Sequence, residues 1–147
     1  MDDIPARIAP TRITWQPLLA TDMDAVVDFA GRVHPALPER REVLAEKLHL
    51  FPAGCRRLVA GGTMCCYALA HPWLLATPPA LDTLLIRLPA DAGCLFIHDV
   101  AVLPQARGSG AGAALMTEAE AVARAHALPA IALIAAYGTA RLWRRFG

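Results

Sequence analysis

Residues 95–116 constrain the fold of this chain more than any other stretch. They begin with an apolar, β-branched run that includes Ile97 and Val102, break at Pro104, pass through the glycine-rich segment 107–112 and continue as an alanine-rich helix. This order predicts a strand, a loop and a helix in succession. Glycines let successive backbone N–H groups converge at a helix N-terminus, which carries about half a positive charge. The stretch therefore predicts an anion site that suits a pyrophosphate.

The residues after this loop argue against two common nucleotide sites. A Walker A loop ends in Gly-Lys-Ser/Thr, and no lysine follows Gly112. A dinucleotide fingerprint has an acidic residue about 20 positions further on. This chain has Ala127 and Leu128 there, so an NAD-type site lacks its acidic ribose partner.

The pattern Gln105-x-x-Gly108-x-Gly110 resembles the coenzyme A loop of the GNAT acyltransferase superfamily, whose signature is Gln/Arg-x-x-Gly-x-Gly/Ala. The alternative is an ordinary glycine-rich turn between a strand and a helix. The resemblance implies acetyl-CoA as cofactor, with its pantetheine arm against the backbone of residues 100–102. The residues assigned to the cofactor are Val100, Ala101, Val102, Gln105, Arg107, Gly108, Ser109, Gly110, Ala111, Gly112 and Trp143.

The resemblance covers residues 12–147 and implies a single α/β (α+β) domain. Its central mixed, mostly antiparallel sheet would be flanked by helices and, with the sequence stopping at Gly147, would lack the family's C-terminal hairpin. Trp143 stands where the family usually has a tyrosine that serves as general acid, and an indole cannot protonate a thiolate. Tyr137 is a weak substitute, and a coenzyme A thiolate can also take its proton from water. Residues 1–11 are expected to form a flexible tail.

Periodicity and turn residues predict the other elements. They are a strand at 13–18, a helix from Thr21 to Pro35, a helix from about Pro38 to Phe51, hairpin strands at 55–60 and 63–70 joined by Gly61 and Gly62, a strand at 94–103, a doubly buried strand at 130–136 and a helix at 139–146. Residues 71–93 hold several prolines and leucines, so a packed lid or a short helix is expected there.

The catalytic candidates are His98 and Asp99, on the strand that leads into the loop. An amine acceptor is almost wholly protonated at neutral pH, so a base must take its proton. Imidazole titrates in the useful range, which makes His98 the expected base and Asp99 the reserve. Strand alternation predicts that the two side chains point to opposite faces. The segment His98–Val102 is similar to that of the serotonin N-acetyltransferases, a branch of the same superfamily in which a matching histidine takes part in deprotonation; the alternative is a histidine that is only hydrogen-bonded in the sheet.

The resemblance places the acceptor pocket at the two N-terminal helices and their connection. His34, Tyr67 and Trp73 are the expected lining, with the leucines of the long segment. Each residue taken alone also fits a plain turn or core position. This lining is apolar, which argues weakly against polycationic acceptors.

Composition limits the partners and the compartment. The formal net charge is +1, which gives no basic surplus for nucleic acid or an anionic membrane. The acidic, proline-broken start does not resemble a signal peptide, no apolar run approaches the ~20 residues of a membrane span, and a cytoplasmic protein is expected. A zinc site at Cys65, Cys66 and His71 is disfavoured because neighbouring strand residues point to opposite faces, and no metal is expected.

The resemblance to the GNAT superfamily implies an N-acetyltransferase that moves an acetyl group from acetyl-CoA to a primary amine of a small molecule or peptide. The alternative is a non-catalytic acyl-CoA-binding or regulatory protein of the same fold. An unfinished sheet would expose a strand edge, which is compatible with a homodimer.

Overall fold

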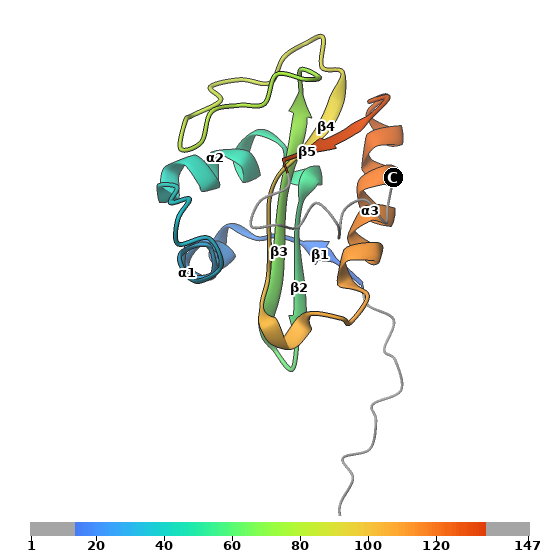
Figure 1. Ribbon diagram of the computed structural model, residues 1–147. Coiled ribbons are helices and arrows are strands. Elements are labelled where there is room, and N and C mark those ends of the chain that lie inside the picture. Colours follow the sequence, from blue (N-terminus) through green and yellow to red (C-terminus); the bar gives the residue numbers. More distant parts are fainter. Residues whose placement is uncertain (1–13, 135–147) are drawn as a thin grey trace, which may run out of the picture.

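A computed structural model describes residues 14–134 as an open five-stranded sheet with helices on both faces (Figure 1). The strands lie in chain order, and they are β1 (Gln16–Pro17), β2 (Cys55–Ala60), β3 (Thr63–Trp73), β4 (Cys94–Val102) and β5 (Ile131–Leu133). The first three pairings are antiparallel and the pairing of β4 with β5 is parallel. This confirms the expected mixed, mostly antiparallel sheet.

The helices divide between the two faces of the sheet. The α-helices are α1 (Met23–Val33), α2 (Arg41–Leu50) and α3 (Ala111–Ala125), and short 3₁₀ turns occur at Ala20–Asp22, Pro52–Gly54 and Pro104–Ala106. Figure 1 shows α1 and α2 on one side of the sheet and α3 on the other. One apolar cluster joins Val26 and Phe29 of α1 to Leu69 of β3, while two others pack residues such as Leu115 of α3 against the opposite face. A side chain on one face of the sheet therefore contacts α1 and α2, and a side chain on the other face contacts α3.

The hairpin of β2 and β3 forms at the predicted turn. Gly61 and Gly62 have φ angles of +59° and +77°, as the primed two-residue turn requires. β3 continues to Trp73, three residues beyond the predicted end, because its last residues pair with β4. The hairpin prediction is confirmed, and the strand is longer than expected.

Both N-terminal helices start later than predicted. The first helix is predicted to start at Thr21, but Thr21 lies inside a 3₁₀ turn, where the Asp22 side chain accepts the Leu19 N–H at 2.7 Å, and α1 starts at Met23. The second helix starts at Arg41 rather than near Pro38. Glu39, which lies before α2, accepts hydrogen bonds from the Asp82 backbone N–H and from the His98 side chain.

Residues 74–93 form an irregular segment without the predicted short helix. The segment is nevertheless packed, because the Glu46 carboxylate on α2 accepts the backbone N–H groups of Leu85 at 2.6 Å and Ile86 at 3.0 Å. Ala76, Asp82 and Ile86 have positive φ angles, which non-glycine residues rarely adopt. The contacts to Glu46 hold the backbone at Ile86 in place, and contacts to Glu39 and Arg40 hold it at Asp82.

A β-bulge in β4 overturns one expectation. Asp99 pairs with Leu69 and Ile97 with Ala70, so His98 is the extra residue opposite that step of β3. The contacts of His98 and Asp99 show that both side chains reach groups of the α1–α2 connection. The prediction that they point to opposite faces is wrong, because the bulge inserts one residue into the alternation.

The C-terminal half of the described chain follows the predicted order of helix and strand. The apolar face of α3 is buried, and Glu118 of α3 pairs with Arg56 at 3.3 Å. β5 is half-buried rather than buried on both faces, and Ile134 beyond it is exposed. The helix stops where Ala127 takes a φ of +53°, the conformation that a glycine usually supplies.

Several predictions concern residues outside the described range. These are the tail at 1–11, the last helix at 139–146, Tyr137 and Trp143. Within residues 14–134, no helix is both long and apolar enough to cross a membrane.

Candidate functional site

Asp99 joins two side chains that the sequence analysis assigned to the acceptor pocket. Its Oδ1 lies 2.8 Å from the Nε2 atom of His34, the residue that ends α1. Its other oxygen accepts the hydroxyl of Tyr67 at 2.5 Å. The structure therefore brings His34, Tyr67 and Asp99 together, and Tyr67 is a buried core residue that reaches the site through its hydroxyl.

The charges of this group follow from its contacts. The hydrogen bond that His34 donates to Asp99 raises the pKa of His34 and outweighs the opposing effect of burial. Burial, reinforced by the Asp99 charge, raises the pKa of Tyr67, so its hydroxyl keeps its proton and donates. Both Asp99 oxygens are thus engaged by hydrogen-bond donors.

His98 forms a second histidine–carboxylate pair beside the first. Its Nε2 atom lies 3.1 Å from each oxygen of Glu39, in the α1–α2 connection, and both side chains are buried. Because a carboxylate accepts, the proton of a neutral His98 belongs on Nε2. Nδ1 then keeps a lone pair, and it has no hydrogen-bond partner within residues 14–134.

His71 lies beside His98, with their ring centroids 5.7 Å apart. It is fully buried and donates from Nδ1 to the Pro72 carbonyl at 3.0 Å. Burial lowers the pKa of His71 to about 4, so the ring is neutral at pH 7. Trp73, the expected wall of the acceptor pocket, packs edge-on against His71, and its indole N–H donates to the Thr77 carbonyl at 2.8 Å.

Lys47 is fully buried on the face of α2 that packs on β3. Its Nζ atom has no hydrogen-bond partner in the described part of the chain. Burial lowers the pKa of this lysine, and the charges of Glu39, Glu46 and Asp82 only partly oppose that effect. Neighbouring carboxylates therefore partly offset the cost of burying the Lys47 ammonium group, but none of the described residues forms a hydrogen bond with it.

The loop before α3 has the geometry that an anion site requires. Gly108 and Gly110 have φ angles of +75° and +85°, and Gly110 is the N-cap of the helix. Residues 107–110 are exposed. The first amides of an α-helix have no acceptor within the helix, so they remain available to an external anion. The exposed Arg107 adds a positive charge, and this loop therefore fits a diphosphate.

One edge of β4 is left open beyond its short pairing with β5. β5 pairs only with Leu95–Ile97. Leu103 donates its N–H to the carbonyl of Cys65 in β3 at 3.0 Å, so the alternate residues Val102 and Val100 direct their peptide groups to the other edge. Within residues 14–134 no strand pairs with that edge at these two residues. The peptide groups of Ala101, in contrast, face β3, and its side chain is buried in the core.

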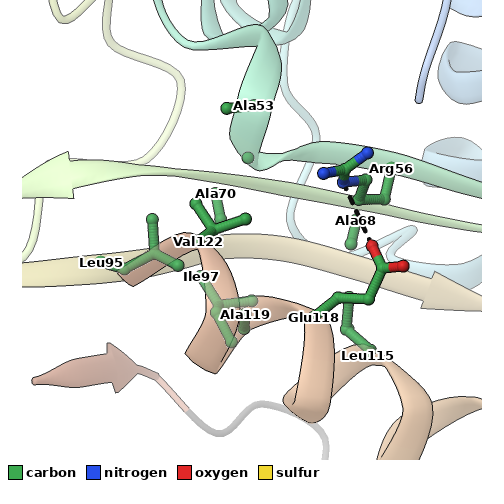
Figure 2. Close-up of a pocket in the computed structure, with 11 residues that line it drawn as sticks. Ala53, Arg56, Ala68, Ala70, Leu95, Ile97, Leu115, Glu118, Ala119 and Val122 are labelled. Carbon is green, nitrogen blue, oxygen red and sulfur yellow. Dashed lines mark ion pairs between the residues drawn. The ribbon is translucent and has the colours of Figure 1, made fainter. Parts of the chain in front are cut away.

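A small pocket lies on the α3 face of the sheet, and neither His34 nor His98 lines it. Figure 2 shows Leu115, Ala119 and Val122 of α3 facing Ala70 and Ile97 of the sheet. The pocket has room for about one water molecule. This pocket is a packing defect of the core rather than the candidate site.

Sequence reasoning missed Glu39 and Lys47. Nothing in the sequence links Glu39 to His98, because the contact depends on the α1–α2 connection crossing the bulge. Lys47 did leave a signal: it shares a helical face with Val43, Leu44 and Leu48. A lysine at such a position is buried with the rest of the face.

Three solved structures illustrate what this fold is similar to. They are Ard1 from Thermoplasma volcanium (14 % identity, 91 % of this chain and 80 % of that chain covered, TM-score 0.70), the GNAT-like decarboxylase GphF in complex with isobutyryl-CoA (22 %, 90 % and 71 %, 0.72), and the ribosomal-protein-S18-alanine N-acetyltransferase from Escherichia coli (18 %, 91 % and 76 %, 0.63). At these identities the similarity shows the fold alone. No curated protein sequence matches the chain significantly.

The family model described as "Acetyltransferase (GNAT) family" matches residues 49–147, which include β2 to β5, the glycine loop and α3. The match agrees with the topology of the sheet and with the strand, loop and helix order. The chain therefore belongs to the GNAT acetyltransferase family.

Proposed function

We propose that this protein is an N-acetyltransferase that transfers the acetyl group of acetyl-CoA to a primary amine of a small molecule or peptide. The observation that carries the proposal is that the edge of β4 at Val100 and Val102, with which no described strand pairs, is followed directly by the glycine loop at the start of α3. At this edge the Val100 carbonyl contacts His34 at 3.2 Å, while no described strand takes the Val100 N–H. A thioester held there lies next to the histidine–carboxylate pairs of the bulge. The similarity to a GNAT-like protein solved with isobutyryl-CoA supports an acyl-CoA ligand.

Coenzyme A would be held mainly by the backbone. The amides of residues 108–112 and the Arg107 guanidinium would bind the diphosphate, with Gln105 at the entrance of the loop. The pantetheine amides would pair with Val102 and with the N–H of Val100 as an added strand, because the Val100 carbonyl already accepts from His34. Ala101 belongs to the core, which removes it from the residues expected to contact the cofactor.

His98 is the proposed base. It takes a proton from the acceptor ammonium through the Nδ1 lone pair, directly or through a water molecule, and the free amine then attacks the thioester carbon. Asp99 is the weaker candidate, because His34 and Tyr67 occupy both of its oxygens. Asp99 instead orients His34 at the acceptor side of the site.

The remaining steps need little from side chains. A backbone N–H at or near Val100 would stabilise the oxyanion of the tetrahedral intermediate, a contribution of about 3 kcal/mol where comparable donors have been removed. The attacking nitrogen of the tetrahedral intermediate loses its second proton to water, collapse of the intermediate breaks the C–S bond, and the thiolate of coenzyme A leaves and takes a proton from water. The product is an amide, and no general acid is required.

The test measures coenzyme A thiol release from acetyl-CoA with a panel of primary amines. We expect amine-dependent turnover that falls by about 10²- to 10⁴-fold in His98→Ala, the usual contribution of a general base. His49→Ala is the control, because His49 is exposed on α2. Tight binding of acetyl-CoA without turnover by any amine would contradict the proposal and favour a non-catalytic acyl-CoA-binding protein.

A further inference from the structure

The α1–α2 connection places one carboxylate between the candidate base and the irregular segment 74–93. Glu39 contacts the Nε2 atom of His98 with both oxygens at 3.1 Å. The same carboxylate accepts the backbone N–H of Asp82 at 3.2 Å. Glu39 therefore joins two parts of the chain that have no other direct hydrogen bond with each other among the described residues.

Asp82 is itself clamped by the residue next to Glu39. Its Oδ1 accepts the backbone N–H of Arg40 at 2.7 Å and the Arg40 Nε at 3.2 Å, and its carbonyl accepts from the same guanidinium at 3.0 Å. Asp82 has a φ angle of +54°. Residues 39 and 40 thus hold Asp82 through its amide, its carbonyl and its side chain, which fixes a backbone conformation that aspartate adopts only occasionally.

The charge on Glu39 persists despite its burial. Burial alone would raise the pKa of this carboxyl, but the hydrogen bond and charge of His98, the Asp82 amide and the Lys47 charge together lower it. The titratable groups around the pair include Lys47 and Glu46 on α2, His34 after α1, Tyr67 and His71 on β3, and Asp99 on β4. Neither Glu46 nor Asp99 has a hydrogen bond to His98 in the described structure, because their oxygens are engaged elsewhere.

A carboxylate on one imidazole nitrogen fixes both the tautomer and the orientation of the ring. In this pair the proton is held on Nε2 and the lone pair on Nδ1, the atom that lacks a partner within residues 14–134. Without Glu39 nothing in the described structure would favour this tautomer over the other. A base that spends part of its time in the wrong tautomer cannot accept a proton from the same position.

We propose that Glu39 is the positioning residue of His98, and that Asp82 in turn positions Glu39; this rests on the proposed acetyl transfer with His98 as base. Segment 74–93 would then help to position the base, through Asp82 and Glu39. Glu39 does not contact the acyl group or the acceptor in this assignment. It acts through His98 alone.

Segment 74–93 offers a matched control. Glu39 and Glu46 both anchor this segment through backbone amides, but only Glu39 touches His98. Glu39→Gln should lower kcat by about 10- to 100-fold, the usual cost of losing the partner that orients a functional histidine, with little change in KM. Glu46→Gln should leave kcat within about threefold. Equal losses in both variants would show that Glu39 only anchors the segment and would overturn the proposal.

A double mutant separates positioning from a second independent role. If Glu39 acts through His98, the loss caused by Glu39→Gln should disappear in a His98→Gln background. An undiminished loss in that background would contradict the proposal. Thermal unfolding of each variant establishes that it is folded under the assay conditions.

A spectroscopic measurement tests the pair without turnover. Long-range ¹H–¹⁵N correlation spectra of the full chain should place the neutral His98 proton on Nε2 in the wild type and in Glu46→Gln, and should show a mixture of tautomers in Glu39→Gln. An unchanged His98 spectrum in Glu39→Gln overturns the positioning role. If the wild type binds acetyl-CoA but acetylates no amine, the proposed function fails, while the spectrum still decides whether Glu39 orients His98.

Discussion

The Nε2 atom of His34, at the end of α1, lies 2.8 Å from Oδ1 of Asp99 on β4. The same histidine nitrogen is 3.2 Å from the Val100 carbonyl, so it faces two acceptors and carries a proton. This contact links the first helix to the strand that would carry the thioester. It also makes the stability of the fold depend on pH.

The raised pKa of His34 determines the sign of that dependence. Because the folded-state pKa lies above the ordinary value of about 6.5, the protonated histidine stabilises the fold. This contribution is complete below the ordinary value and is lost as the pH rises through the folded-state value. In urea denaturation, the difference in unfolding free energy between wild type and His34→Gln should shrink from pH 5.5 to pH 8.5. A difference that grows over this interval would contradict the assignment.

Lys47 should cost stability in its present environment. The group is fully buried and its Nζ atom has no hydrogen-bond partner in the described structure. Replacing it with methionine, which has a similar length, should raise the free energy of unfolding at pH 7 by about 1–3 kcal/mol, the usual penalty of an unsatisfied buried donor. The gain should shrink towards pH 10. There the folded lysine, with its lowered pKa, loses its proton before the unfolded one does. A less stable Lys47→Met protein would show that the surrounding carboxylates outweigh burial.

Two glycines should respond in opposite directions to the same substitution. A Cβ on Gly54 would lie 2.1 Å from the Ala70 carbonyl oxygen, whereas a Cβ on Gly31 of α1 would meet nothing within 4 Å. Gly54→Ala should therefore destabilise the protein by about 1–3 kcal/mol through overpacking. Gly31→Ala should stabilise it by about 0.5–1 kcal/mol, because alanine is the better helix former. Chemical denaturation measures both, and similar effects of the two changes would contradict the packing around Gly54.

Arg107 should contribute to coenzyme A affinity without contributing to the fold. Its side chain is exposed beside the glycine loop, where a charge-assisted hydrogen bond to the diphosphate is available. Arg107→Ala should weaken binding about tenfold, or about 1.4 kcal/mol, in a calorimetric titration at low salt. Arg124→Ala, at the other end of α3, is the control because that side chain is exposed and far from the loop. Equal affinities for wild type and Arg107→Ala would remove this residue from the site.

The glycine loop and the hairpin could be predicted from the sequence because their physics is local. Gly61 and Gly62 adopt positive φ angles through their own conformational freedom, and the strand, loop and helix around Gly108 follow from consecutive residues. No distant contact is needed for either prediction. The family match and the topology of the sheet confirm the fold that this stretch implied.

The pairing of the catalytic candidates could not be predicted, because it depends on an inserted residue and a distant connection. Strand alternation placed His98 and Asp99 on opposite faces, and the bulge places them on the same one. Glu39 lies in the α1–α2 connection, whereas the sequence pattern placed it in the first turn of the second helix. Its contact with His98 exists only after α1 and α2 have packed on the sheet.

The most direct test of the account is a crystal structure of the protein with acetyl-CoA. The account predicts the diphosphate within hydrogen-bond distance of the amides of residues 108–112, the pantetheine amides paired with Val100 and Val102, and the thioester beside the bulge at His98. Density for the cofactor at any other place, or a glycine loop without a diphosphate at saturating acetyl-CoA, would contradict it.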